Sequence, residues 1–151
     1  MDRQTLIKNA EEIISVSSES LKEFKDKREL VLYKENQIML ERPDIYEMIG
    51  GEKNVQMMKD NHFNHLQFIS SIIETPDPET LVDTVVWVFK TYMSRGFQST
   101  YWQAQLETWV SVFKENFSEK TFNEIKPLYE WLLRNISVFE SLSREKPTEQ
   151  L

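Results

Sequence analysis

Cysteine is absent from this chain of 151 residues, and glycine and histidine are scarce. Without cysteine there can be no disulfides, thiolate zinc sites, iron–sulfur clusters or cysteine nucleophiles, and such a composition is typical of a reducing compartment. The three glycines, Gly50, Gly51 and Gly96, cannot form a P-loop or a Gly-x-Gly-x-x-Gly turn. The two histidines leave little room for catalysis by imidazole.

The chain also lacks a long hydrophobic segment and an excess of positive charge. Its longest apolar run covers residues 85–89, far below the roughly 20 residues of a membrane span, and its N-terminus does not resemble a signal peptide. Its 18 basic and 25 acidic residues give a net charge of −7, which disfavours nucleic-acid binding. We therefore expect a cytoplasmic protein with no membrane span and no nucleic-acid partner.

The residues that are present are typical of one folded domain. Apolar residues make up 40% and aromatic residues 12% of the sequence, too much for a disordered chain. A chain of this length buries roughly 70% of the surface that its unfolded form exposes. We expect a single domain over residues 1–151 with one core, ending in a polar tail that frays from about residue 144.

Apolar residues recur with a helical period almost throughout, and no segment alternates long enough to be a strand. Asp77 with Pro78, and Ser118, are expected helix starts, and Pro127 is expected to kink the last helix. The inner stripe of the second helix is predicted to consist of Leu21, Phe24, Arg28, Val31 and Ile38. The predicted helices cover, approximately, residues 3–16, 19–40, 44–49, 52–74, 78–95, 99–116 and 118–142.

The order of these helices is globin-like, with two long helices at the end and an apolar one before them. We expect an all-α, globin-like fold of six to eight helices in which the helix at 78–95 is central and buried. A globin holds haem iron through a histidine on that helix, but here the helix has none and offers Tyr92 and Met93 instead. Tyrosine ligates haem in some proteins, yet the missing histidine favours a fold without haem.

His62 and His65 lie on the inner stripe of the helix at 52–74. Three interpretations are open: histidines hydrogen-bonded within the core, ligands of a metal ion, or a polar pair that faces a ligand. A metal ion would need two or more further ligands, and cysteine cannot supply them. The core interpretation is therefore favoured, the ligand-facing pair comes second, and no metal site is expected.

A ligand pocket is expected between the helices at 52–74 and 78–95. Arg95, at the end of the second of these helices, either interacts favourably with the helix dipole or lies at the pocket mouth and pairs with a carboxylate; the first interpretation is favoured. The predicted lining of the pocket consists of Met58, His62, His65, Ile69, Val85, Phe89 and Tyr92.

The last two predicted helices carry more tryptophan than one helix pair can bury. Trp102 and Trp109 share one face of the helix at 99–116, and Trp131 lies on the helix at 118–142. Surplus apolar surface of this kind indicates a dimer interface. We therefore expect a homodimer through these helices, with Trp131 pointing outward.

Catalytic chemistry has little support in the sequence. Most carboxylates fall at solvated helix positions, and no serine has a histidine partner in a recognisable motif. No nucleophile–base–orienter set is found, so the chain is not expected to be an enzyme.

Several short segments between about residue 35 and residue 142 resemble a known family. The chain resembles the haemless globin-like sensor domains of bacterial stress and sporulation regulators, among them stressosome co-antagonists and a sporulation histidine kinase. It is most similar to the sporulation-inhibitory proteins of the anthrax plasmids, which are freestanding copies of that kinase's sensor domain. The matching segments are Met-Met-Lys-Asp-Asn-His at 57–62, His-Leu at 65–66, Val-Asp-Thr-Val-Val-Trp at 82–87, Tyr-Met-Ser-Arg-Gly-Phe at 92–97 and Tyr-Glu-Trp-Leu at 129–132.

The resemblance implies a haemless globin fold, a homodimer through the last helices, a fatty acid in a hydrophobic tunnel and a halide ion, chloride for example, in the interior. It also implies a role in signal transduction, namely inhibition of sporulation by competing with the sensor histidine kinase for its signal. The chain ends at Leu151 without a kinase output domain. We therefore expect it to act by binding, either by lowering the free concentration of a ligand or by pairing with the kinase.

Two other functions stay open. The first is a haem-binding gas sensor or small redox enzyme, which a Soret band in the purified protein would reveal. The second is an inhibitor that contacts the kinase directly and needs no small ligand. Tight kinase binding without a co-purifying fatty acid would favour it.

Overall fold

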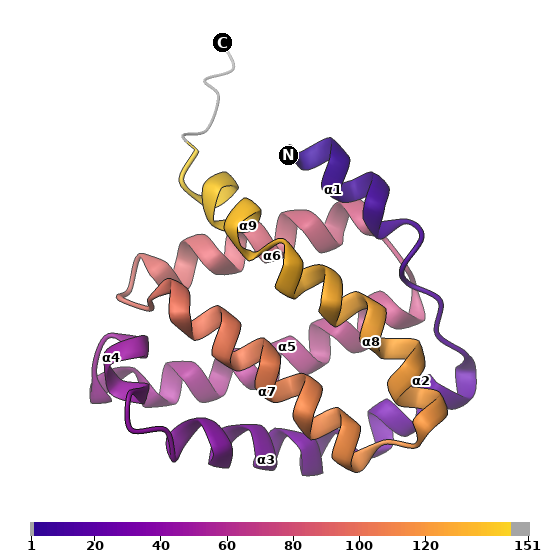
Figure 1. The fold of residues 1–151 in the computed structure, drawn as a ribbon, viewed down its shortest axis with the longest axis horizontal. Helices are drawn as coiled ribbons and strands as arrows, with labels where there is room; N and C mark the ends of the chain where they lie inside the picture. Colours follow the sequence, from indigo (N-terminus) through magenta and orange to yellow (C-terminus); the bar gives the residue numbers. More distant parts are fainter. Residues whose placement is uncertain (1, 146–151) are drawn as a thin grey trace.

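The computed structural model describes residues 2–145, and these residues form an all-α, globin-like fold (Figure 1). The polar tail is predicted to begin at about residue 144, and its residues 146–151 lie outside the described part. Within it, nine α-helices and one 3-10 helix follow one another as α1 (Arg3–Ala10), α2 (Ser18–Asp26), α3 (Arg28–Leu40), α4 (Ile45–Ile49), η1 (Glu52–Asn54), α5 (Val55–Glu74), α6 (Pro78–Met93), α7 (Ser99–Asn116), α8 (Glu119–Arg134) and α9 (Ile136–Ser143).

The helices pack in crossed layers. In Figure 1, α7 and α8 cross in front of α5 and α6, and α3 runs along the lower edge. α3 packs against α5 and α7, whereas α6 packs against α1 and α9. Together the helices enclose one hydrophobic core, to which α6 contributes Leu81, Val82 and Phe89.

Local capping signals in the sequence correctly predict several helix boundaries. The Asp77 carboxylate accepts a hydrogen bond from the Thr80 backbone N–H, with Pro78 as the first helical residue of α6. Ser118 caps α8 in the same way by accepting from the Thr121 N–H. Such caps satisfy N–H groups that a helix leaves without partners at its start, and they confirm the predicted starts of α6 and α8.

Two predicted helices are each divided in two, so the helix count exceeds the predicted six to eight. The second predicted helix breaks at Lys27 (φ −100°, ψ 7°) and the last at Asn135 (φ −110°, ψ 13°). The Asn135 side chain donates to the Trp131 carbonyl at 2.9 Å, which satisfies an acceptor at the end of α8. α8 continues through Pro127. The first predicted helix is also shorter than expected and ends at Ala10.

The expectation that α6 is buried all round is wrong. Leu81, Val82 and Phe89 face the core, but Trp87 is 62% exposed and Val85 is only partly buried. α6 is covered by α1 and α9 on one side. Its other apolar side borders a pocket, described below, rather than another helix.

The tryptophans of the last helices lie inside the molecule, contrary to prediction. Trp102, Trp109 and Trp131 are at most 2% exposed, and Trp131 packs edge-on against Phe139 with ring centroids 5.4 Å apart. The prediction that Trp131 points outward is therefore wrong, because α9 packs on its face of α8. A homodimer stays a prediction, but surplus tryptophan no longer supports it.

The end of α4 is fixed against the end of α6. Gly50 adopts a left-handed conformation (φ +82°), and a Cβ there would lie 2.8 Å from the Gly96 carbonyl oxygen. The Asn54 side chain donates to the carbonyls of Ile49 and Arg95 at 2.8 and 3.0 Å. Only glycine permits this close approach at position 50.

Candidate ligand-binding site

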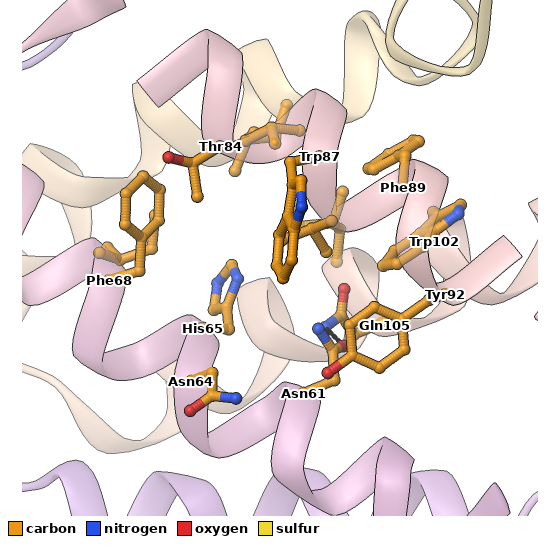
Figure 2. A pocket seen from close by; sticks show the side chains of 15 residues that line it. Asn61, Asn64, His65, Phe68, Thr84, Trp87, Phe89, Tyr92, Trp102 and Gln105 are labelled. Carbon is orange, nitrogen blue, oxygen red and sulfur yellow. Dashed lines mark hydrogen bonds between the residues drawn. The ribbon is translucent and has the colours of Figure 1, made fainter. Parts of the chain in front are cut away.

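A pocket of about 230 Å³ lies between α5, α6 and α7, with one contribution from α8 (Figure 2). Exposed Trp87 and Asn64 line it, so it opens to the surface beside them. Its walls are mainly aliphatic and aromatic and include Phe68, Ile69, Val85, Val88, Phe89, Leu106 and Leu132. An apolar concavity with a few polar groups is the usual form of a small-molecule site.

The pocket has the location that the sequence predicts and most of the predicted lining. The residues that line it as predicted are His65, Ile69, Val85, Phe89 and Tyr92. Met58 and His62 do not line it, because both are fully buried in the core. The exposed Arg95 does not line it either, and the helix-end interpretation of this residue stays a prediction.

α7 contributes pocket residues that the sequence reasoning missed. Gln105 and Trp102 line the pocket, although the prediction considered only the two helices on either side. Gln105 is 2% exposed and donates to the Asn61 side-chain oxygen at 2.7 Å. A polar residue among Trp102, Leu106 and Trp109 was the available signal. These two buried carboxamides form a polar floor beneath apolar walls.

A chain of hydrogen bonds connects this floor to α3. The Tyr101 hydroxyl lies 2.7 Å from Asn61 Oδ1 and 3.1 Å from His62 Nε2. His62 Nδ1 lies 2.6 Å from the side-chain oxygen of Asn36 on α3. When the His62 Nδ1–H donates to Asn36, Nε2 of the same ring is an acceptor. The Tyr101 hydroxyl then faces two acceptors, His62 Nε2 and Asn61 Oδ1, and lies nearer to Asn61. Burial, helped by the proximity of His65, lowers the pKa of His62 to about 3.

His65 lies between the pocket and the aromatic rings of Trp109 and Tyr129. Its Nε2 is 2.6 Å from the Tyr129 hydroxyl, and its ring stacks on Trp109 with centroids 5.4 Å apart. Burial between these rings lowers the pKa of His65, and one edge of the residue remains open to the pocket. Both histidines are therefore neutral above mildly acidic pH. Each of the two favoured interpretations applies to one of them: His62 is a core residue, and His65 faces the pocket.

Glu35 is the most unusual side chain near this network, and the sequence reasoning missed it. It is fully buried on α3, and neither of its carboxyl oxygens has a hydrogen-bond partner. Burial raises its pKa well above the ordinary value. The signal was its spacing, since Val31, Glu35 and Met39 recur at i, i+4 and i+8 on one buried face. The predicted stripe contained Ile38 and not Glu35, but Ile38 is 40% exposed.

Three buried indoles also lack partners. The Nε1 atoms of Trp102, Trp109 and Trp131 have no hydrogen-bond acceptor. A buried donor without an acceptor costs roughly 1–3 kcal/mol. Trp102 lines the pocket and stacks on Phe89 with centroids 4.3 Å apart. These donors are candidates for an anion or a water molecule in the interior.

Other kinds of site receive no support from the geometry. Among residues 2–145 there is no cluster of three or more histidine, aspartate or glutamate side chains that could hold a metal ion. Across the same residues, no helix is both long enough and apolar enough to cross a bilayer. His62 uses both ring nitrogens in hydrogen bonds and His65 uses its Nε2, at 2.6 to 3.1 Å, so haem iron could bind His62, or Nε2 of His65, only if one of these bonds broke.

Comparison with known proteins returns nothing: no family model matches the chain, and no curated protein or solved structure matches it significantly. The function is therefore argued from the pocket itself.

Proposed function

We propose that this chain is a cytoplasmic sensor domain that binds a fatty acid in the α5–α6–α7 pocket and inhibits sporulation by sequestering the signal of a sensor histidine kinase. The observation that carries the proposal is the pocket: apolar walls on three helices above a small polar floor. The sporulation role rests on the resemblance of the sequence to the haemless sensor domains.

The energetics of an acyl chain agree with such a pocket. Each buried CH₂ group contributes about 0.8 kcal/mol. Ten such groups contribute about 8 kcal/mol before the costs of association are subtracted, so we expect micromolar affinity or weaker. Sequestration at that affinity works only when the protein is abundant relative to its ligand. Inhibition should therefore scale with the amount of protein expressed.

A halide ion is part of the same proposal. The support for it is the set of buried indole N–H groups without acceptors, above all those of Trp109, which stacks on His65, and Trp131, neither of which lines the pocket. A bound chloride would satisfy such donors. Anomalous scattering from crystals grown with bromide tests this proposal directly. A bromide peak away from all three indoles would contradict the assignment.

Filling the pocket should abolish lipid binding. Val85 lines the pocket and is partly buried, so Val85→Trp places an indole inside the space that an acyl chain needs. Its neighbour Val86 is also partly buried but lies away from the pocket, so Val86→Trp is the matched control. We expect at least a tenfold loss of fatty-acid affinity in Val85→Trp and little change in Val86→Trp, measured by calorimetry with circular dichroism as the folding check. Equal affinities in both variants would place the lipid elsewhere.

The same pair of variants tests the mechanism in cells. If sequestration is the mechanism, Val85→Trp should lose inhibition of sporulation while Val86→Trp keeps it. A Val85→Trp protein that binds no lipid yet inhibits fully would favour the direct kinase inhibitor. That alternative is favoured by the exposed apolar side chains on α3, namely Leu30, Tyr33 and Ile38, which are 40 to 64% exposed.

The purified protein should show no Soret absorbance, even after incubation with hemin. The reasons are the absence of histidine from α6 and the engagement of both histidines of α5. Absorbance spectra before and after gel filtration measure this. Stoichiometric haem with an axial histidine signal that His65→Ala abolishes would contradict the proposal and support the haem sensor.

A further inference from the structure

The pocket contains no charged side chain. Among the described residues that line it, the polar ones are asparagine, glutamine, threonine, tyrosine, tryptophan and one histidine. The histidine, His65, is neutral because it is packed between Trp109 and Tyr129. No lysine or arginine of the lining can pair with a carboxylate. A charged headgroup would therefore enter the pocket without a counter-ion.

The floor is equipped for a neutral hydrogen-bonding group instead. Gln105 donates to Asn61 Oδ1, and that oxygen also accepts from Tyr101. Asn61 Oδ1 is thus fully used, which leaves the Gln105 carbonyl oxygen and the Asn61 NH₂ group, whose two N–H donors serve the Tyr92 hydroxyl and one further acceptor. One is an acceptor and the other a donor. A hydroxyl or a protonated carboxyl group offers the complementary pair, whereas a carboxylate only accepts.

Desolvation acts in the same direction. An ionised carboxylate that leaves water for an apolar cavity loses its hydration, and it regains little where no cation meets it. Burial raises the pKa of the Tyr92 phenol at the pocket. Of the two charged groups that affect this pKa, Asp60 raises it further and Arg95 lowers it. Neither lines the pocket.

On these grounds, and resting on the proposed lipid-binding function, we infer that the pocket binds its lipid with an uncharged headgroup against the floor formed by Asn61 and Gln105. A fatty acid then binds as the protonated acid, and a fatty alcohol of the same length binds at least as well. The site discriminates by charge as well as by chain length.

This selectivity has a definite pH dependence. A free carboxylic acid of ordinary pKa, near 4.3 for a glutamic side chain, is almost fully ionised at neutral pH. When only the acid form binds, its apparent affinity falls tenfold for each pH unit above that pKa. Between pH 6 and pH 8 the affinity for a fatty acid should fall about 100-fold, and the affinity for the alcohol should stay within about twofold.

The test compares decanoic acid with 1-decanol on delipidated protein at pH 6, 7 and 8 by calorimetry. We expect the ratio of the two affinities to change about 100-fold over this range. The ratio isolates the ligand carboxyl, because the alcohol experiences the same changes in the protein. The titratable groups around the site are His65 and Tyr92 at the pocket, Asp60 and Arg95 near Tyr92, and, behind the lining, Glu35, His62, Tyr101 and Tyr129.

Each outcome decides between the two proposals. A ratio that changes less than about threefold means that the carboxylate itself binds, which overturns the inference and leaves lipid binding intact. Failure of both ligands to bind at every pH overturns the proposed function and the inference with it. Binding of 1-decanol that Val85→Trp removes and Val86→Trp retains places the alcohol in this pocket. Loss in neither variant places it elsewhere and also overturns the inference.

Discussion

Replacing Glu35 by glutamine should stabilise the protein by about 1 kcal/mol or more at pH 7. The carboxyl group is fully buried and has no hydrogen-bond partner, so burial raises its pKa and favours the protonated form in the folded state. In the unfolded chain it is ionised at pH 7, and folding must take up a proton. That uptake costs about 1.4 kcal/mol for each pH unit above the ordinary pKa near 4.5, and glutamine removes the cost.

The sign of the effect sets its pH dependence. The pKa of Glu35 is higher in the folded state than in the unfolded state, so its unfavourable contribution begins above the unfolded pKa and grows as the pH rises towards the folded pKa. The gain from Glu35→Gln should therefore be small at pH 5 and large at pH 7, as measured by urea unfolding at both values. Glu29→Gln, an exposed position on the same helix, is the control and should change stability by less than about 0.5 kcal/mol. A gain that is equal at both pH values would show that Glu35 is ionised in the folded protein.

Truncating Trp131 to alanine should destabilise the protein by about 3–5 kcal/mol. The indole is fully buried and packs edge-on against Phe139 of α9, so its removal leaves a cavity between α8 and α9. The control is Trp87→Ala, because Trp87 is 62% exposed and little packing is lost there. We expect the control to change stability by less than about 1 kcal/mol. Urea unfolding followed by circular dichroism measures both variants.

The corresponding charge substitution separates a core role from an interface role. Trp131→Glu would bury an unpaired carboxylate in the core and should prevent folding at 37 °C. A folded, monomeric Trp131→Glu protein, seen by light scattering alongside a dimeric parent, would instead show that Trp131 lies in a subunit interface.

A structural feature can be predicted from the sequence when the contacts that form it join residues close together in the chain. The start of α6 at Asp77-Pro78 and the whole of α7 are readable from the sequence because a cap and a helical period involve residues three or four apart. The same spacing places His65 and Ile69 on one face of α5, and both line the pocket. Local periodicity therefore predicts which residues share a face.

Which face is buried, and against what, is decided elsewhere in the chain. Glu35 lies inside because α7, about 70 residues further on, packs over that side of α3. Trp131 is buried because α8 ends at Asn135 and α9 turns back over it, a break that the apolar period runs straight through. Gln105 reaches the pocket because α7 crosses α5 beside Asn61.

By itself, then, the sequence determined the helices, their main caps and which residues of α5 and α6 share a face, because these depend on contacts within a few residues. Only the tertiary structure decided that His62 and Met58 belong to the core, that Glu35 is buried without a partner and that the pocket floor is uncharged. The physical reason is that burial and desolvation depend on every helix packed around a side chain, and those helices come from distant parts of the chain.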